Sequence, residues 1–203
     1  AFIALAGTIF VKTKTTNNNR NNRNMKIGIF CSANDNIDKS YFKLTEELGK
    51  WMANKGHALV YGGGNSGLME SIGKAVHEAG GQTIAMVPRI MEEDCRMSKY
   101  VDVHFPCEDL TDRKALIMEQ SDVFIALPGG IGTLDEVFTV AASHTIGYHN
   151  KPMLLYNMNG FWDAAIHLLE DMQKRGMIRG HYTKYIKVVK SIEEIEESLI
   201  EIH

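Results

Sequence analysis

From residue 26 onward, short apolar segments alternate along the chain with amphipathic segments of helical spacing. The apolar segments are rich in β-branched and aromatic residues and lack apolar–polar alternation, which is typical of strands buried on both faces. Such strands are expected at residues 26–31, 58–61, 82–87, 101–105, 123–127, 153–156 and 186–189. Helices are expected at residues 41–51, 67–79, 110–120, 133–148, 161–175 and 191–202. This order predicts an α/β fold, a single Rossmann-like, doubly wound parallel sheet with helices on both faces.

The composition, 44% hydrophobic and 23% charged over 203 residues, is that of a globular protein. It excludes a disordered chain, a collagen-like repeat and a disulfide scaffold. Nowhere do about 18 apolar residues follow one another, so no membrane partner is expected. The three cysteines, Cys31, Cys95 and Cys107, form no C-x-x-C pair. They suit a reducing cytoplasm, which is the expected location, and argue against a zinc knuckle.

Charge is distributed unevenly along the chain. Residues 1–24 hold four basic and no acidic side chains, whereas the other 179 residues hold 18 basic and 25 acidic ones, a net charge of −7. Binding a polyanion requires a basic face. We therefore expect no nucleic-acid partner, while a small anionic ligand held by a few local donors is compatible with this charge.

The first 24 residues do not share the strand–helix pattern. An apolar stretch at residues 1–11 precedes residues 17–24, which hold six asparagines and two arginines. The apolar stretch lacks the basic region and the small-residue cleavage site of a signal peptide. We interpret residues 1–24 as a disordered leader, added in cloning or mis-translated, with a short cytosolic extension as the alternative. A single Rossmann-like domain is then expected over residues 25–203.

The first glycine cluster lies at residues 61–69 (YGGGNSGLM), between an expected strand and an expected helix. Glycines at this place let the backbone turn tightly and present N–H groups to an anion at the helix N-terminus. The alternative is a tight turn that binds nothing. The cluster is neither a G-x-G-x-x-G dinucleotide motif with a following acidic residue nor a P-loop, so these two kinds of site are disfavoured.

The second cluster lies at residues 128–136 (PGGIGTLDE) and follows the expected strand 123–127. Gly129, Gly130 and Gly132 leave room for a phosphate or a ribose against bare backbone. Thr133 either caps the following helix or donates a hydrogen bond to a phosphate. Thr133 and Glu136 also match a capping box, so a purely structural role for Glu136 is the alternative.

A basic pair, Arg113 and Lys114, lies on the expected helix that leads into the strand before the second cluster. On spacing alone the pair would be a solvated helix turn. Because this helix leads directly into the strand that ends at the glycines, both side chains can lie near the mouth of the phosphate-binding loop.

These three elements together resemble the LOG ("Lonely guy") family, over the chain from residue 26 to near its C-terminus. Its members are cytokinin-activating nucleoside 5′-monophosphate phosphoribohydrolases, and many carry the label lysine decarboxylase. The resemblance implies that Arg113 and Glu136 are catalytic and that Ser32, in the C-S-A-N loop after the first strand, contacts the nucleotide. It further implies binding roles for the remaining glycines and polar residues of the motifs: Gly63, Gly64, Lys114, Gly129, Gly130, Gly132 and Thr133. The family's dimers make a homodimer the expected assembly.

Several positions depart from the family pattern. Leu110-Thr111 replaces the usual Met-His before the Arg-Lys pair, Glu70 replaces the glycine of G-L-M-G, and residues 142–147 (ASHTIG) replace Thr-Trp-x-Gln-x-Gly. The phosphoribosyl end of the site is therefore kept while the end for the base is altered. The catalytic class is better supported than cytokinin specificity. A non-catalytic nucleotide sensor or carrier of the same fold is the alternative.

The expected reaction is hydrolysis of the N-glycosidic bond of a purine nucleoside 5′-monophosphate, with or without an N6 substituent, to free base and ribose 5-phosphate. Its transition state has a cationic sugar, which a carboxylate such as Glu136 stabilises near C1′. Arg113 is always protonated, so it is expected to bind phosphate or the leaving base. His144 and His149 are five residues apart with no third ligand, and neither a metal nor an organic cofactor is expected.

Overall fold

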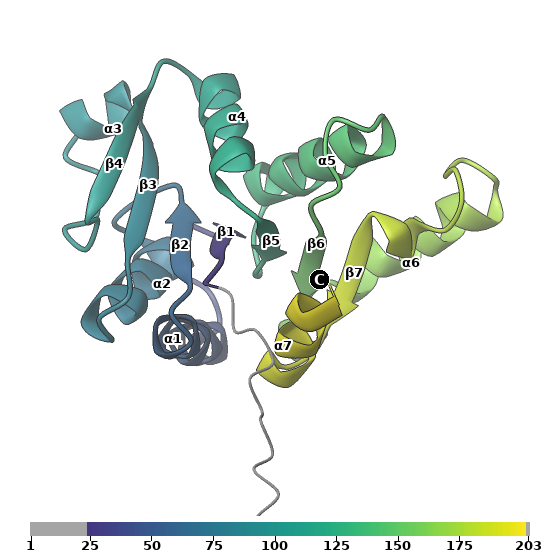
Figure 1. Ribbon diagram of the computed structural model, residues 1–203, viewed down its shortest axis with the longest axis horizontal. Helices are drawn as coiled ribbons and strands as arrows, with labels where there is room; N and C mark the ends of the chain where they lie inside the picture. Colours follow the sequence, from purple (N-terminus) through teal and green to yellow (C-terminus); the bar gives the residue numbers. More distant parts are fainter. Residues whose placement is uncertain (1–23, 202–203) are drawn as a thin grey trace, which may run out of the picture.

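A parallel sheet forms the centre of the protein, as the computed structural model in Figure 1 shows for residues 24–201, the part of the chain that is described. Its strand order is β4-β3-β2-β1-β5-β6-β7, and every pair of neighbours is parallel. The strands are β1 (Lys26–Phe30), β2 (Ala58–Tyr61), β3 (Thr83–Pro88), β4 (Val103–Cys107), β5 (Val123–Ala126), β6 (Met153–Tyr156) and β7 (Ile186–Val189). The predicted α/β fold class is confirmed.

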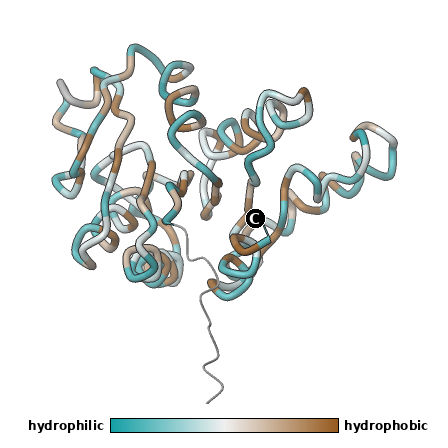
Figure 2. The backbone as a smooth tube through the Cα atoms, in the orientation of Figure 1, coloured by the Kyte–Doolittle hydropathy of each residue, from teal (hydrophilic) through white to brown (hydrophobic). Residues whose placement is uncertain are grey.

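Helices cover both faces of this sheet. They are α1 (Lys39–Asn54), α2 (Gly67–Glu78), α3 (Arg89–Glu93), α4 (Leu110–Gln120), α5 (Ile131–Thr145), α6 (Asp163–Lys174) and α7 (Ile192–Glu201), with short 3₁₀ turns η1 (Met158–Gly160) and η2 (Tyr182–Lys184). One buried cluster joins α1, α2 and α7 to one face, and a second joins α4, α5 and α6 to the other. Figure 2 shows the apolar residues along the strands and the polar ones on outer helix turns.

Alternate residues of a strand enter opposite clusters, because successive side chains point to opposite faces. In β5, Val123 and Ile125 pack with α1, α2 and α7, whereas Phe124 and Ala126 pack with α4, α5 and α6. All four side chains are buried. A strand buried on both faces has no polar side, which is why these segments lack alternation in the sequence.

The strand order reverses between β1 and β5. From β1 the chain proceeds outward through β2 and β3 to β4, then returns to place β5 on the other side of β1, with Ile27 opposite Val123. Ligands of open α/β sheets bind at the carboxyl ends of the two strands that flank such a reversal. There the loops after β1 and β5 meet, and the Ser32 N–H donates to the Pro128 carbonyl at 3.0 Å.

Helix α5 begins earlier than its capping-box pattern predicts. Its first residue is Ile131 and its N-cap is Gly130, which provides no side-chain cap. Thr133 is therefore inside the helix, where it is buried, and the helix start expected at residue 133 is wrong. The capping box of Thr133 and Glu136, the alternative role for these residues, does not form because the N-cap is Gly130. The helix ends before Gly147, whose φ of +83° is the left-handed conformation that closes a helix.

Strand β4 is shifted two residues beyond the predicted 101–105. The cause is Asp102, whose carboxylate accepts hydrogen bonds from the N–H of Thr83 at 2.8 Å and from its hydroxyl at 3.0 Å. These bonds hold Asp102 at the start of β3, so pairing in the sheet begins at Val103. The predicted leader, residues 1–24, lies outside the described residues except for Asn24. No helix between residues 24 and 201 is long and apolar enough to cross a membrane.

Candidate active site

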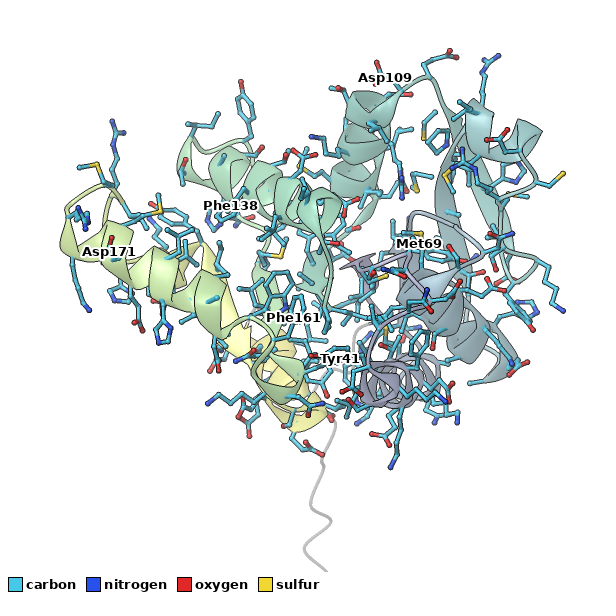
Figure 3. The ribbon with its side chains drawn as sticks, turned by 180° about the vertical axis from the view of Figure 1, so that it is seen from behind. Tyr41, Met69, Asp109, Phe138, Phe161 and Asp171 are labelled. Carbon is cyan, nitrogen blue, oxygen red and sulfur yellow. The ribbon has the colours of Figure 1, made fainter. Side chains whose placement is uncertain are left out.

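A cavity of about 660 Å³ opens at the reversal between β1 and β5, a size usual for small-molecule sites. Its wall comes from four parts of the chain that are distant in sequence. The loop after β1 contributes Ser32 and Asp35, α4 contributes Arg113, and α5 contributes Thr133 and Glu136. Met69 of α2, labelled in Figure 3, belongs to the same wall.

The N-terminus of α5 is open to this cavity. Gly130 and Gly132 line it, and a Cβ at either position would meet no atom within 4 Å. The N–H groups of the first helical turn have no acceptor within the helix, and Gly130 supplies no side-chain cap. Free N–H groups and the positive end of the helix dipole favour an anion. The geometry therefore suits a phosphate at this end of the cavity.

The N-terminus of α2, on the opposite wall, is already occupied by a carboxylate. Asp35 Oδ1 accepts a hydrogen bond from the Gly67 N–H at 2.8 Å. Gly67 has a φ of +59°, and a Cβ there would overlap the backbone of residues 32–34, so only glycine allows this close approach. Because Asp35 brings negative charge to this helix end, a second anion is disfavoured there.

Arg113 reaches the cavity by passing over the first glycine turn. Its guanidinium occupies the place that a Cβ on Gly62 would take. Arg113 Nε is buried and has no hydrogen-bond partner among the described residues. The guanidinium is therefore packed against the glycine turn, and Arg113 is one of the residues that line the cavity.

Glu136 lies in a partly buried position on α5, facing the same cavity. Burial raises the pKa of its carboxyl to about 7, because the charged form loses solvation. The nearby charges of Arg113 and Lys114 oppose this rise, and that of Asp135 adds to it. A carboxyl with a pKa near neutrality can take up and release protons at physiological pH.

The Cys31 thiol lies at the floor of the cavity, at the end of β1. Burial, with a smaller contribution from the charge of Glu136, raises its pKa far above the usual range, while Arg113 acts in the opposite direction. The thiol is therefore protonated at neutral pH and is a poor nucleophile. Its proximity to both charged groups shows that Arg113 and Glu136 converge on one region.

Comparison with known proteins extends these observations. A family model described as "Possible lysine decarboxylase" matches residues 69–199. The cytokinin riboside 5′-monophosphate phosphoribohydrolase LOG5 of Arabidopsis thaliana is 34% identical over 155 residues, which cover 76% of this chain and 68% of the relative. Its counterpart LOG3 from the same plant is 31% identical over 176 residues, covering 87% and 82% respectively. The chain belongs to the LOG family.

Solved structures agree with this LOG-family fold. The molybdenum cofactor carrier protein of Chlamydomonas reinhardtii superposes with a TM-score of 0.68 at 22% identity, covering 89% of this chain and 98% of the carrier. At this identity the likeness concerns the fold alone.

Six of the residues predicted for the LOG-family site lie together in the cavity wall: Ser32, Arg113, Gly130, Gly132, Thr133 and Glu136. The backbone groups of Ser32 bind Pro128 and Met69, and its Oγ accepts from the Asn34 N–H at 3.0 Å. This arrangement leaves the hydroxyl proton of Ser32 available to a ligand.

The other four predicted residues have protein contacts instead. Gly129 packs against the Thr133 side chain, and Gly63, with a φ of +68°, packs against Ala85. The Gly64 N–H lies 3.1 Å from Met69 Sδ. Lys114 Nζ binds the Asp135 carboxylate at 2.8 Å. A substrate-binding role for these four residues stays a prediction that their placement does not favour.

The word decarboxylase in the description of the LOG-family model has no counterpart in this cavity. Decarboxylation of an amino acid through a Schiff base needs a lysine amine in the site, and no lysine is among the cavity-lining side chains of the described chain. Lys114, the lysine next to Arg113, is engaged with Asp135. Among the side chains that the structure describes, no group of three or more His, Cys, Asp or Glu is arranged to hold a metal ion.

Three contributors to the LOG-family site were not predicted from the sequence. Gly62 makes room for Arg113, Asp35 occupies the α2 N-terminus, and Met69 forms part of the wall. Gly62 and Asp35 act through a residue on another element, Arg113 and Gly67 respectively, whereas Met69 lines the cavity directly. The triple glycine itself was visible, but nothing in the sequence shows that its first member faces an arginine.

Proposed function

We propose that this LOG-family chain hydrolyses the N-glycosidic bond of a purine nucleoside 5′-monophosphate, releasing the free base and ribose 5-phosphate. The observation that carries the proposal is the convergence of Arg113 and Glu136 on one cavity beside the uncapped N-terminus of α5. The phosphoribohydrolase activity named for the two Arabidopsis relatives supports it.

The 5′-phosphate binds at the start of α5. There the N–H groups of Gly132 and Thr133 face it without competing side chains, whereas Asp35 disfavours the α2 end. Binding at this point places the ribose near Glu136, which lies about one helical turn further along α5. The base then extends toward the wall formed by Asp35 and Met69.

Hydrolysis breaks the bond between C1′ and the base nitrogen, and the electron pair leaves with the base. The developing cationic sugar is stabilised by the ionised Glu136 carboxylate. The same carboxylate accepts a proton from the attacking water, whose oxygen forms the new bond to C1′. The departing base takes up a proton from solvent, and Glu136 releases to solvent the proton that it accepted, so that one water is consumed for each bond broken. Arg113 cannot act as a proton donor, so it binds phosphate or stabilises negative charge on the leaving base.

The second candidate is a nucleotide sensor or carrier without turnover. The substitutions at the base end favour it, above all Glu70 in place of a glycine, since Glu70 Oε2 is buried without a hydrogen-bond partner in the described chain. A carrier would hold the nucleotide without needing a carboxyl of raised pKa. The raised pKa of Glu136 therefore supports the hydrolase.

Assembly and location complete the proposal. The chain acts as a homodimer, and apolar side chains at the outer end of α5, Ile146 at 66% and Tyr148 at 81% exposed, are candidates for its interface. Figure 3 shows Phe138 on the same helix. The free cysteines suit the cytoplasm, and the acidic body is unsuited to duplex nucleic acid. Light scattering, which measures the mass in solution, tests the homodimer. Titration with duplex DNA at several salt concentrations tests the lack of nucleic-acid binding.

The decisive experiment incubates the protein with AMP, and separately with an N6-substituted AMP, and separates the products by chromatography. Equimolar release of base and ribose 5-phosphate is expected. The ratio of the two rates reports the choice of base. Calorimetric binding of AMP without any released base would instead support the carrier and overturn the hydrolase.

A further inference from the structure

An ion pair joins the immediate neighbours of the two proposed catalytic residues. Lys114 follows Arg113 on α4, and Asp135 precedes Glu136 on α5. Lys114 Nζ lies 2.8 Å and 3.0 Å from the two carboxylate oxygens of Asp135. One contact therefore bridges the two helices at the turn where each carries its catalytic side chain, and Figure 1 shows α4 and α5 side by side.

A third group completes the contact. Thr139 lies one helical turn after Asp135, and its hydroxyl is 3.4 Å from Lys114 Nζ and 3.5 Å from Asp135 Oδ1. The Lys114 and Asp135 side chains are 22% and 56% exposed, whereas Lys187 and Glu201, which form a surface pair elsewhere, are 44% and 71% exposed. Partial burial limits the screening that weakens ordinary surface pairs. The Lys114–Asp135 pair is thus better placed than Lys187–Glu201 to hold two helices together.

Helix α4 needs such support near its start. Of its eleven residues only Ile117 is buried, whereas α5 buries Thr133, Val137, Val140 and Ala141. The far end of α4 is held by Lys151, whose Nζ binds the Met118 and Glu119 carbonyls at 2.6 Å and 3.2 Å. Near Arg113, after the N-cap at Asp109, the Lys114–Asp135 ion pair connects α4 to α5 in the same way that Lys151 holds the other end of α4.

We propose that Lys114, together with Asp135 and Thr139, is a positioning residue that fixes Arg113 and Glu136 relative to each other and does not bind substrate. The inference rests on the proposed hydrolase function. Successive helical residues point about 100° apart, so the pair can face between the helices while its neighbours face the cavity. The cavity wall agrees, because it includes Arg113 and Glu136 and neither Lys114 nor Asp135.

The pair also acts on Glu136 through its charges, with opposite signs. Lys114 lowers the pKa of Glu136 and Asp135 raises it. Loss of Lys114 should therefore raise the pH midpoint of activity, and loss of Asp135 should lower it. If both residues had a purely structural role, the loss of one and the loss of the other would not move this midpoint in opposite directions.

The test compares Lys114→Met, Asp135→Asn and the double variant with wild type and with Lys187→Met, a control that breaks an exposed pair. For each, kcat and KM for AMP, the pH profile and the melting temperature are measured. Each single change should lower kcat about tenfold with little change in KM, because misplacement affects the transition state most. The double variant should be no slower than the worse single variant, because both remove one interaction. Lys114→Arg should restore most of kcat.

A KM raised about tenfold or more in Lys114→Met at unchanged kcat would make Lys114 a substrate ligand and overturn the proposal. An unchanged kcat and KM, or fully additive losses in the double variant, would also overturn it.

A readout without turnover separates this inference from the proposed function. NMR of labelled glutamate side chains follows the titration of Glu136, and hydrogen exchange follows the first turns of α4. Wild type that releases no base from AMP would defeat the hydrolase proposal and the catalytic part of this inference. Faster exchange in α4 and opposite shifts of the Glu136 titration would still support the tie between the helices, and their absence would overturn it.

Discussion

The two glycine-rich turns have similar sequences and opposite surroundings. In the turn after β2, Gly62 lies against the Arg113 guanidinium and Gly63 against Ala85, so protein atoms fill the space that the missing side chains leave. In the turn after β5, a Cβ on Gly130 or Gly132 would meet nothing within 4 Å. The difference teaches that glycine density alone does not mark a ligand site. The first turn packs against Arg113, the arginine proposed as catalytic, and the second is open where the phosphate is proposed to bind.

Of the two turns, filling the first should have the larger effect. Gly62→Ala places a methyl group where the Arg113 guanidinium lies, so the side chain must move. A displacement of about 1 Å near the reacting groups costs roughly 10²-fold in rate, and overpacking of this kind costs about 1–3 kcal/mol of stability. Turnover of AMP and thermal melts measure both. Wild-type turnover in this variant would show that the turn does not position Arg113.

Glu136, on the helix that follows the second turn, should lower the stability of the folded protein at neutral pH, because its carboxyl is partly buried. The folded protein binds the proton of Glu136 more tightly than the unfolded chain, since folding raises the pKa from 4.5 to about 7. Wild type therefore loses stability as the pH rises from 4.5 through 7. Glu136→Gln removes this loss, so it should match wild type near pH 4.5 and exceed it by about 3 kcal/mol at pH 8. Denaturant unfolding at the two pH values measures the difference, and an equal gain at both would contradict it.

Filling the second turn should have a smaller effect, of another kind. Gly132→Ala adds a methyl group in open space on a helix, so the fold should gain up to about 1 kcal/mol. The methyl group enters the space proposed for the phosphate. KM for AMP should therefore rise about tenfold with kcat little changed, because ground and transition states lose the same contact. Steady-state kinetics of Gly132→Ala and Gly62→Ala, measured together, show whether the first variant changes KM and the second changes kcat. A fall in kcat without a rise in KM for Gly132→Ala would contradict the proposed difference between the two turns.

The fold could be predicted because its signal is local. Apolar strands such as β2 and β6 have the predicted bounds, and α4 begins and ends at the predicted residues. The start of α5 was missed because Thr133 and Glu136 match a capping box and so predict a later start. The actual N-cap, Gly130, has no side chain, so the sequence carries no signal for it.

The site was predictable only as far as its motifs reach. Five of the six candidate residues share the cavity wall because the loop with Ser32 and the motif at residues 128–136 follow β1 and β5, which are neighbours at the reversal of the sheet. Arg113 reaches the same wall from α4. The partners of Gly62, Gly67 and Lys114 lie on other elements, at Arg113, Asp35 and Asp135. Such pairings arise from packing in three dimensions, and no spacing along the chain indicates them.

The central claim is that Glu136 and Arg113, converging at the open turn, hydrolyse the glycosidic bond. The most direct test follows base release from AMP between pH 5 and pH 9 for wild type and Glu136→Gln, with AMP affinity measured on the same samples. Wild-type turnover should rise with a midpoint near 7, where Glu136 ionises. Glu136→Gln should bind AMP nearly as well, lose about 10²–10³ in rate and show no such midpoint. Turnover close to wild type in Glu136→Gln, or the same midpoint without the carboxyl, would contradict the account.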